Sequence, residues 1–391
     1  MNKGNLASAV RSHYPKAFGI RDALAKRKKD SYSKNRRPIE EIRKAEEEGL
    51  KEDFVFSYWS DARLVEKVEK DIETILVNAP QYAERMDLDD VRIDMKFAYL
   101  AYGFLPDEYL CYDLEDKLFD ERRSYISDSD RYEIVYGVND IASMQTLLNK
   151  ARAFKALRPY YHRDGLVITG RKELTAFKEF LQKHPEFVLK KPCASRGSGV
   201  SLVKLASADE KELLKSIKRF TAEGPCLIEE RISQNGHVAS LNKSSVNTIR
   251  CITLDGGDGP KVAFTFAKVG REGSFIDNGG AGGVLFGVDL DTGVGNTDGI
   301  DELNRTYTMH PDSQTQFKGF QFPRWDEMRA LCIEMSSHFP ELPYIGWDVA
   351  CSDDGWVLVE GNMGQFIGPQ VTAKRGIKEE VQQLLNRHLF D

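Results

Sequence analysis

The chain of 391 residues lacks several features that identify common protein classes. Its six cysteines are dispersed, without a C-x-x-C pair, which argues against a structural zinc site and a disulfide framework. No uncharged apolar run approaches the roughly 18 residues that a membrane span needs. The first residues lack the apolar stretch of a signal peptide. We therefore expect a soluble protein of a reducing cytoplasm that has no membrane span.

Familiar catalytic signatures are also absent. No Gly-Lys dipeptide occurs, so the P-loop signature cannot be present, and neither H-E-x-x-H nor G-x-S-x-G occurs. The seven histidines show no metal-ligand spacing. These absences exclude a P-loop nucleotide site, a zinc-protease site and an esterase nucleophile elbow.

Charge is unevenly distributed along the chain, which carries a net −6. Residues 1–50 hold thirteen Lys and Arg against seven Asp and Glu. A basic segment can bind nucleic acid or a membrane surface. However, this one continues into the acidic run at 46–48, and no aromatic residue interrupts the basic run at 26–29 to stack on bases. Solvated helices are the better interpretation, and we expect no nucleic-acid partner.

The character of the chain changes near Asn139. Residues 1–135 are charged and mostly helical in pattern, whereas short β-rich runs then alternate with helices. The periodicity predicts single helices over 141–154, 324–339 and 374–389. Two hairpins are predicted where β-rich runs flank Gly/Asp turns, at 246–254 with 262–269 and at 345–351 with 356–360. The predicted fold class is α+β with antiparallel sheets, rather than a doubly wound parallel sheet.

The second hairpin carries a candidate metal site. Asp348 and Glu360 lie on opposite arms, and Asn362 follows two residues after Glu360, on the same face of a strand. Two carboxylates and an amide oxygen are hard ligands of the kind that suits Mg²⁺. A solvated hairpin is the alternative, but the apolar neighbours on both arms disfavour it.

A lysine-bearing strand leads into a small-residue turn over 189–200. Lys190 and Lys191 precede a segment in which Ser195, Gly197, Ser198 and Gly199 allow backbone N–H groups to approach an anion. A lysine adds a point charge for a phosphate. An ordinary hairpin turn with surface lysines is an equally weighted alternative.

Two arginines are candidates for anion stabilisation. Arg250 lies with Asn247 in a strongly β-prone run, where a buried guanidinium needs an anionic partner, either a ligand or a structural carboxylate. Arg271 precedes the run 279–283, in which four of five residues are glycine. That composition indicates either close backbone approach to a ligand or a mobile loop, and a plain flexible loop remains an alternative.

Taken in their order along the chain, the four sites at 189–200, 246–250, 271–283 and 346–362 resemble the ATP-grasp superfamily, in particular its sugar-transfer-associated branch, found beside polysaccharide biosynthesis. The resemblance covers roughly residues 136–370, and its most specific pieces are Val246-Asn247-Thr248-Ile249-Arg250, Asp277-Asn278 with the glycines that follow, Gly346-Trp347-Asp348 and Glu360-Gly361-Asn362. It implies an accessory region at 1–135, a small subdomain with a hinge at 136–232, and a central subdomain with the metal site at 233–391. ATP would lie between the two subdomains.

The resemblance also implies roles for individual residues. ATP phosphates would contact Lys191, the loop residues Ser195, Gly197, Ser198 and Gly199, and either Lys150 or Lys155. Adenine would lie beside the hinge residues Glu229 and Glu230. Asp348, Glu360 and Asn362 would bind Mg²⁺.

The implied activity is an ATP-dependent ligase that forms an amide through an acyl phosphate, from an amine and a carboxylate on a sugar or glycan precursor. Amino-acid ligases of the superfamily often have an arginine two residues before the metal aspartate, where this chain has Gly346. Arg250, Arg271 and Asn247 are therefore the expected catalytic residues. A kinase acting on a hydroxyl and a nucleotide-binding module without turnover are the alternatives, and the complete metal set speaks against the second.

Overall fold

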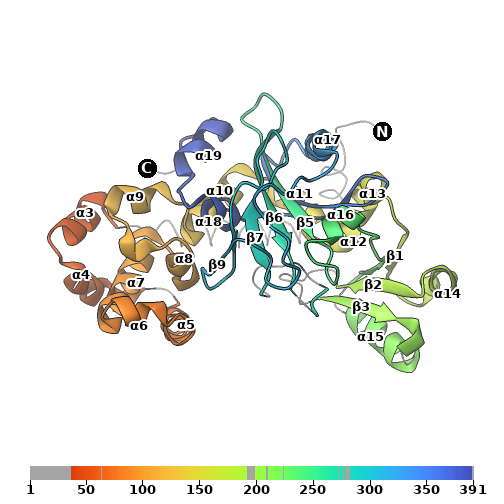
Figure 1. Cartoon of the computed structure of the whole chain (residues 1–391), viewed down its shortest axis with the longest axis horizontal. Coiled ribbons are helices and arrows are strands. Elements are labelled where there is room, and N and C mark those ends of the chain that lie inside the picture. The colour runs from red at the N-terminus through yellow and green to blue at the C-terminus, as the bar shows by residue number, and fades with distance from the viewer. Residues whose placement is uncertain are drawn as a thin grey trace.

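The computed structural model describes residues 37–389 except 63, 192–198, 208–209, 223, 272, 276 and 278–281. A helical region lies on one side of a large antiparallel sheet, and a smaller antiparallel sheet lies on the other (Figure 1). This arrangement confirms the predicted α+β class. Within the described ranges, no helix is both long enough and apolar enough to cross a membrane.

The helical region has its own buried cores, and local capping sets several of its helix ends. Helix α7 begins where the Asp87 side chain accepts a hydrogen bond from the Asp89 amide (2.8 Å), and it ends at Gly103, whose φ is +78°. The elements are α3 Ile39–Glu47, α4 Lys51–Tyr58, η1 Trp59–Asp61, α5 Val65–Asn78, α6 Gln81–Arg85, α7 Leu88–Tyr102, α8 Pro106–Cys111, η2 Leu114–Asp116, α9 Phe119–Ser124 and α10 Asp128–Val138.

Three short helices lead to the first strand: α11 Ile141–Leu148, α12 Lys150–Ala156 and α13 Arg158–Tyr161. The prediction of one helix over 141–154 was wrong, because the chain breaks at Asn149. The Asn149 side chain accepts a hydrogen bond from the Arg152 amide at 3.1 Å and so starts a new helix. Lys150 is consequently the first residue of α12.

The small sheet has the strand order β1-β4-β2-β3. Helices α14 and α15 pack their apolar sides on one of its faces (Figure 1). Its elements are β1 Gly165–Ile168, η3 Arg171–Glu173, α14 Leu174–Lys183, β2 Glu186–Lys190, β3 Val200–Lys204, η4 Leu205–Ser207, α15 Glu210–Ala222 and β4 Cys226–Glu230.

The large sheet has the order β11-β10-β5-β6-β7-β8-β9, and both predicted hairpins, β5–β6 and β10–β11, are confirmed in it. Every residue of β5 and β10 is buried, because elements cover both faces. The elements are α16 Gly236–Ala239, β5 Thr248–Leu254, β6 Lys261–Val269, β7 Val284–Gly287, β8 Gly299–Ile300, β9 Thr306–Tyr307, α17 Trp325–Ser337, β10 Tyr344–Cys351, β11 Trp356–Asn362, α18 Ile367–Ala373 and α19 Lys378–Leu385.

The predicted helix over 324–339 is confirmed as α17, but the tail differs from the prediction of one helix over 374–389. Lys374 adopts φ +50° and ends α18 rather than starting a helix. Gly376 then passes so close to Ser124 that a Cβ there would lie 2.2 Å from the Ser124 backbone. This tight contact with the helical region delays α19 until Lys378.

Candidate functional site

Strand pairing brings three charged residues into one row. Asp348 on β10 pairs directly with Glu360 on β11 and, on its other side, with Arg250 on β5. Side chains of directly opposed residues lie on the same face, with Cβ atoms about 4.5–5.5 Å apart. The register of the three strands therefore places Glu360, Asp348 and Arg250 side by side, although Arg250 is far from the other two in sequence.

A glycine next to this row leaves room for the arginine. Gly346 pairs with Asn362, and a Cβ at position 346 would lie 3.3 Å from Cδ of Arg250. A larger side chain at 346 would therefore crowd the guanidinium group. Arg250 thus lies against position 346.

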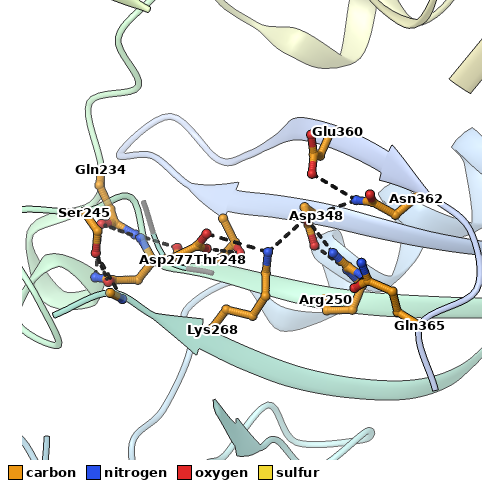
Figure 2. Close-up of polar contacts among 12 residues, drawn as sticks. Gln234, Ser245, Thr248, Arg250, Lys268, Asp277, Asp348, Glu360, Asn362 and Gln365 are labelled. Carbon is orange, nitrogen blue, oxygen red and sulfur yellow. Dashed lines mark hydrogen bonds and ion pairs between the residues drawn. The ribbon is translucent and has the colours of Figure 1, made fainter. Parts of the chain in front are cut away.

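Asp348 is buried and accepts hydrogen bonds from several cationic and polar groups. Arg250 donates to both of its carboxylate oxygens, with Nη2 at 2.8 Å from Oδ2, and donates through Nη1 to Oε1 of Gln365. Lys268 Nζ donates to Oδ2 at 3.0 Å. Figure 2 shows Arg250 between Asp348 and Gln365, and Lys268 between Asp348 and Asp277. Burial disfavours the charged guanidinium, yet the Asp348 carboxylate raises the pKa of Arg250.

A different cation, Lys150, stabilises the ionised form of Glu360. Lys150 Nζ, at the start of α12, donates to Oε2 at 2.9 Å. Burial by itself raises the pKa of Glu360, but the charges of Lys150 and Lys268 outweigh it and lower the pKa to about 2. Asn362 joins the two acids, since its Nδ2 donates to Glu360 Oε1 and to Asp348 Oδ2, each at 3.2 Å.

Asp277 extends the network along β5 and β6. Its carboxylate accepts a hydrogen bond from Oγ1 of Thr248 and lies 3.6 Å from Nζ of Lys268. Burial raises the pKa of Asp277, whereas the Lys268 charge acts to lower it. Lys268 therefore links two carboxylates from opposite ends of the site.

A second charged cluster lies on the small sheet. The Glu229 carboxylate on β4 forms ion pairs with Lys190 on β2 and with Arg163, whose Nη2 is 3.0 Å from Oε1 of Glu229. Burial acts to raise the pKa of Glu229, but the two cations lower it below its usual range. Arg163 also donates to the Leu358 carbonyl at 2.7 Å, which connects this cluster to β11.

Both clusters line one cavity of about 750 Å³ between the two sheets. Helix α8 and the start of α10 form a further wall, through residues such as Leu105, Glu108 and Arg131. The cavity is of the size that holds small-molecule ligands. Among the site residues predicted from the sequence, those that line it are Lys150, Glu229, Glu230, Arg250, Asp348, Glu360 and Asn362.

The structure places Lys190, rather than the predicted Lys191, in the cavity. Alternation along the strand sets Lys191 on the side of Phe187 and Leu189, opposite Lys190. Phe187 and Leu189 pack in the core beneath α14 and α15. Lys190, on the other side, lines the cavity. Of the two candidate lysines on α12, Lys150 lines the cavity, whereas Lys155 is exposed.

Three other predicted residues lie elsewhere. The Asn247 side chain is buried within the loop before β5, where it donates to the carbonyls of Val238 and Asn242 and does not line the cavity. Arg271 lies over the Tyr307 ring, 5.9 Å from its centroid. Gly199 accepts a hydrogen bond from the Lys191 amide at 2.8 Å.

Other predictions fall outside the described residues. Ser195, Gly197 and Ser198 are among them, as is most of the glycine-rich run 279–283, which was predicted to be a mobile loop. Sequence reasoning also missed residues that the structure brings to the cavity or against Arg250, namely Lys268, Arg163 and Gln365. A signal existed for Lys268, because it is a charge in the β-rich run 262–269, where every other residue except Thr265 is apolar, and so requires a buried partner. No local pattern marks Arg163 or Gln365.

A model of the sugar-transfer associated ATP-grasp family matches residues 122–386. The chain belongs to this family. The match includes every residue of both charged clusters and leaves helices α3–α8 outside it. It confirms the resemblance drawn from the ordered motifs.

Solved structures similar to this member of the ATP-grasp family include three enzymes. The D-alanine-D-alanine ligase from Coxiella burnetii shares 14% identity over 64% of this chain and 60% of its own, with a TM-score of 0.40. N5-carboxyaminoimidazole synthetase from Staphylococcus aureus shares 9% identity over 68% of this chain and 60% of its own, with a TM-score of 0.41. The D-cycloserine synthetase DcsG shares 13% identity over 72% of this chain and 82% of its own, with a TM-score of 0.40. Among curated protein sequences, none matches this chain.

The donor set at the row of acids fits Mg²⁺ in its chemistry. Asp348, Glu360 and Asn362 supply two carboxylates and an amide, and Mg²⁺ is commonly held by one or two carboxylates together with substrate phosphates. In the part of the chain that the structure describes, no three acids, histidines or cysteines gather as a metal site. A metal here would therefore depend on the amide and on ligand oxygens to complete its coordination.

Proposed function

We propose that this chain is an ATP-dependent carboxylate–amine ligase, in which ATP and Mg²⁺ bind in the cavity between the two sheets. The observation that carries the proposal is the convergence of the predicted metal set with four cations on one cavity: Lys150, Lys190, Arg250 and Lys268. Phosphoryl transfer depends mainly on positioning and electrostatic stabilisation, which such a set supplies. Membership of an ATP-grasp family supports ATP as the nucleotide.

We assign the roles from the placement of the side chains. Lys190 and Lys150 would bind phosphate oxygens from the two sides of the cavity, and Glu230 on the hinge strand β4 would lie beside adenine. Lys191 and the loop residues 195–199 stay predicted phosphate contacts. Arg250 would stabilise negative charge at the reacting centre, in place of the arginine that Gly346 replaces.

The proposed reaction has two steps. A carboxylate oxygen of the first substrate attacks the γ-phosphorus of ATP, which gives an acyl phosphate and ADP. The amine of the second substrate then attacks the acyl carbon, and phosphate leaves as the amide forms and the amine loses a proton. Mg²⁺, when bound, neutralises charge on the phosphate oxygens. Arg250, which is fixed by Asp348 and Gln365, is already oriented when that charge develops.

The description of the family, sugar-transfer associated, supports a carboxylate on a sugar or glycan precursor as the first substrate. The test uses purified protein, ATP, Mg²⁺ and a panel of uronic acids and sugar carboxylates combined with amino sugars and amino acids. ADP, free phosphate and product mass are measured together. A ligase releases one phosphate for each ADP and gives a product lighter than its two substrates by one water.

Two other results would contradict the proposal. Phosphate that stays covalently on the acceptor would identify a kinase. Nucleotide binding without ADP formation across the panel would indicate a binding module. Glu360→Gln is the matched negative control, since it keeps the shape of the side chain and removes the charge.

A further inference from the structure

The predicted metal ligands are already held by cations of the protein. Arg250 binds both oxygens of Asp348, and Lys268 binds Oδ2 at 3.0 Å. Lys150 binds Glu360 Oε2 at 2.9 Å. A divalent ion that entered this site would have to displace lysine N–H groups from both carboxylates.

Charge balance makes such an exchange unfavourable for a bare metal ion. Three carboxylates, from Asp277, Asp348 and Glu360, face three cations, from Arg250, Lys268 and Lys150. The neighbouring Glu229 adds no negative charge, because two cations accompany it. An added divalent ion would leave an uncompensated charge of +2 at a largely buried site, where Coulomb energies exceed those in water. The same ion bound to ATP carries an excess of negative charge instead.

The cations differ in how readily they can leave. The Arg250 guanidinium is buried, makes a two-point contact with Asp348 and is held from behind by Gln365. Lys150 and Lys268 carry their ammonium groups on flexible four-carbon stems, without the planar two-point geometry of a guanidinium. Asn362 points its Nδ2 at both acids, and rotation of its amide would turn Oδ1 toward a metal. The two lysines are therefore the groups that would move when ligand binds.

We propose that Lys150 and Lys268 are internal counter-ions that keep divalent metal out of the Asp348–Glu360 site until nucleotide arrives. The two lysines then bind oxygens of the triphosphate instead of the carboxylates. The freed carboxylates accept the metal that enters with the nucleotide. This inference rests on the proposed function, since it requires a polyphosphate ligand in the cavity. It gives the lysines a role in the order of binding, beyond holding phosphate.

The test measures binding of Mn²⁺ by electron paramagnetic resonance of the free ion, using the full chain with and without the non-hydrolysable analogue adenylyl imidodiphosphate. Wild type should bind Mn²⁺ at least about tenfold more tightly with the analogue than alone. Lys268→Met and Lys150→Met should each bind Mn²⁺ alone at least about tenfold more tightly than wild type, because an acid loses its counter-charge. Lys268→Gln, which keeps a hydrogen-bond donor and loses the charge, should gain likewise.

Lys155→Met is the matched control, since Lys155 lies on the same helix as Lys150 but is exposed. It should bind Mn²⁺ as wild type does. Thermal unfolding checks that each variant is folded, and adding Glu360→Gln to Lys150→Met should remove the gain. Tight binding of Mn²⁺ alone by wild type, or no gain in any lysine variant, would overturn the inference. Failure of wild type to bind the Mn²⁺–analogue complex, with the gains present, would instead overturn the proposed ATP site.

Discussion

The helical region and the large sheet each contain a buried arginine on an aspartate, and the two pairs differ in what surrounds them. In the helical region, Arg122 donates to Asp94 at 3.0 Å and also to the carbonyls of Leu114 and Lys117, so protein atoms take its donors. Among the described residues, Asp348 and Gln365 accept the hydrogen bonds of Arg250, and Arg250 lines the cavity. Arg122 does not line that cavity. Burial and pairing are thus the same for Arg122 and for Arg250, and the adjoining cavity is what supports the proposed role of Arg250.

The largest expected effect comes from removing the arginine of the helical region. Arg122→Met leaves Asp94 and Glu46 buried beside an apolar side chain, and loss of one partner of a buried pair costs about 3–5 kcal/mol. We expect the free energy of unfolding to fall by that amount in urea denaturation. The folded fraction should still bind nucleotide. An unchanged unfolding midpoint would remove the contrast between the two pairs.

Replacing each arginine with lysine separates a role in stability from a role in the reaction. Arg250→Lys keeps the charge and loses the planar fork, so we expect turnover to fall on the order of tenfold to a hundredfold while the ATP dissociation constant changes little. Arg122→Lys should instead lower the melting temperature and leave turnover per folded molecule unchanged. Turnover, ATP affinity and thermal unfolding are measured for each. If Arg250→Lys loses only thermal stability, Arg250 is a structural ion pair like Arg122.

Acid titration tests the carboxylates of the two networks. The pKa of Glu360 is lowered from 4.5 to about 2, and that of Asp94 is also lowered. A depressed pKa in the folded state stabilises the protein above the unfolded pKa, and this stabilisation is lost as pH falls through the folded pKa. The stability advantage of wild type over Glu360→Gln should therefore shrink between pH 4.5 and about 2. The difference is modest, because a third of the Glu360 side chain is exposed to screening solvent. A difference in unfolding free energy that stays constant with pH would contradict the lowered pKa of Glu360.

The smallest effect is expected at a neighbouring pair of lysines on the small sheet. Lys190 lines the cavity and Lys191 does not, so Lys190→Ala should weaken nucleotide binding more than Lys191→Ala. This order reverses the expectation from the family resemblance, which assigned the phosphate contact to Lys191. Dissociation constants for adenylyl imidodiphosphate are compared between the variants. The opposite order would restore Lys191 as the main phosphate contact.

Much of the fold was predictable because its signals are local. The turns that follow Leu254 and Cys351 are marked by glycine and aspartate, and both hairpins formed where those turns predicted them. The helix predictions failed where long-range contact or a cap intervened. Asn149 started a second helix, and the passage of Gly376 against Ser124 delayed the last one.

The local sequence predicts the β10–β11 hairpin through its tight turn, whereas the direct opposition of Asp348 and Glu360 also depends on a register shift between Asp348 and Val349. The sequence also determined membership of the family, through motifs that keep their order along the chain. The pairing of each cation with its acid depends on contacts between elements that are distant in the sequence. Lys150 reaches Glu360 from α12, Arg250 reaches Asp348 across β5 and β10, and Lys268 joins from β6. Strand order and helix docking set these contacts, and a local pattern shows that a buried charge needs a partner without identifying it.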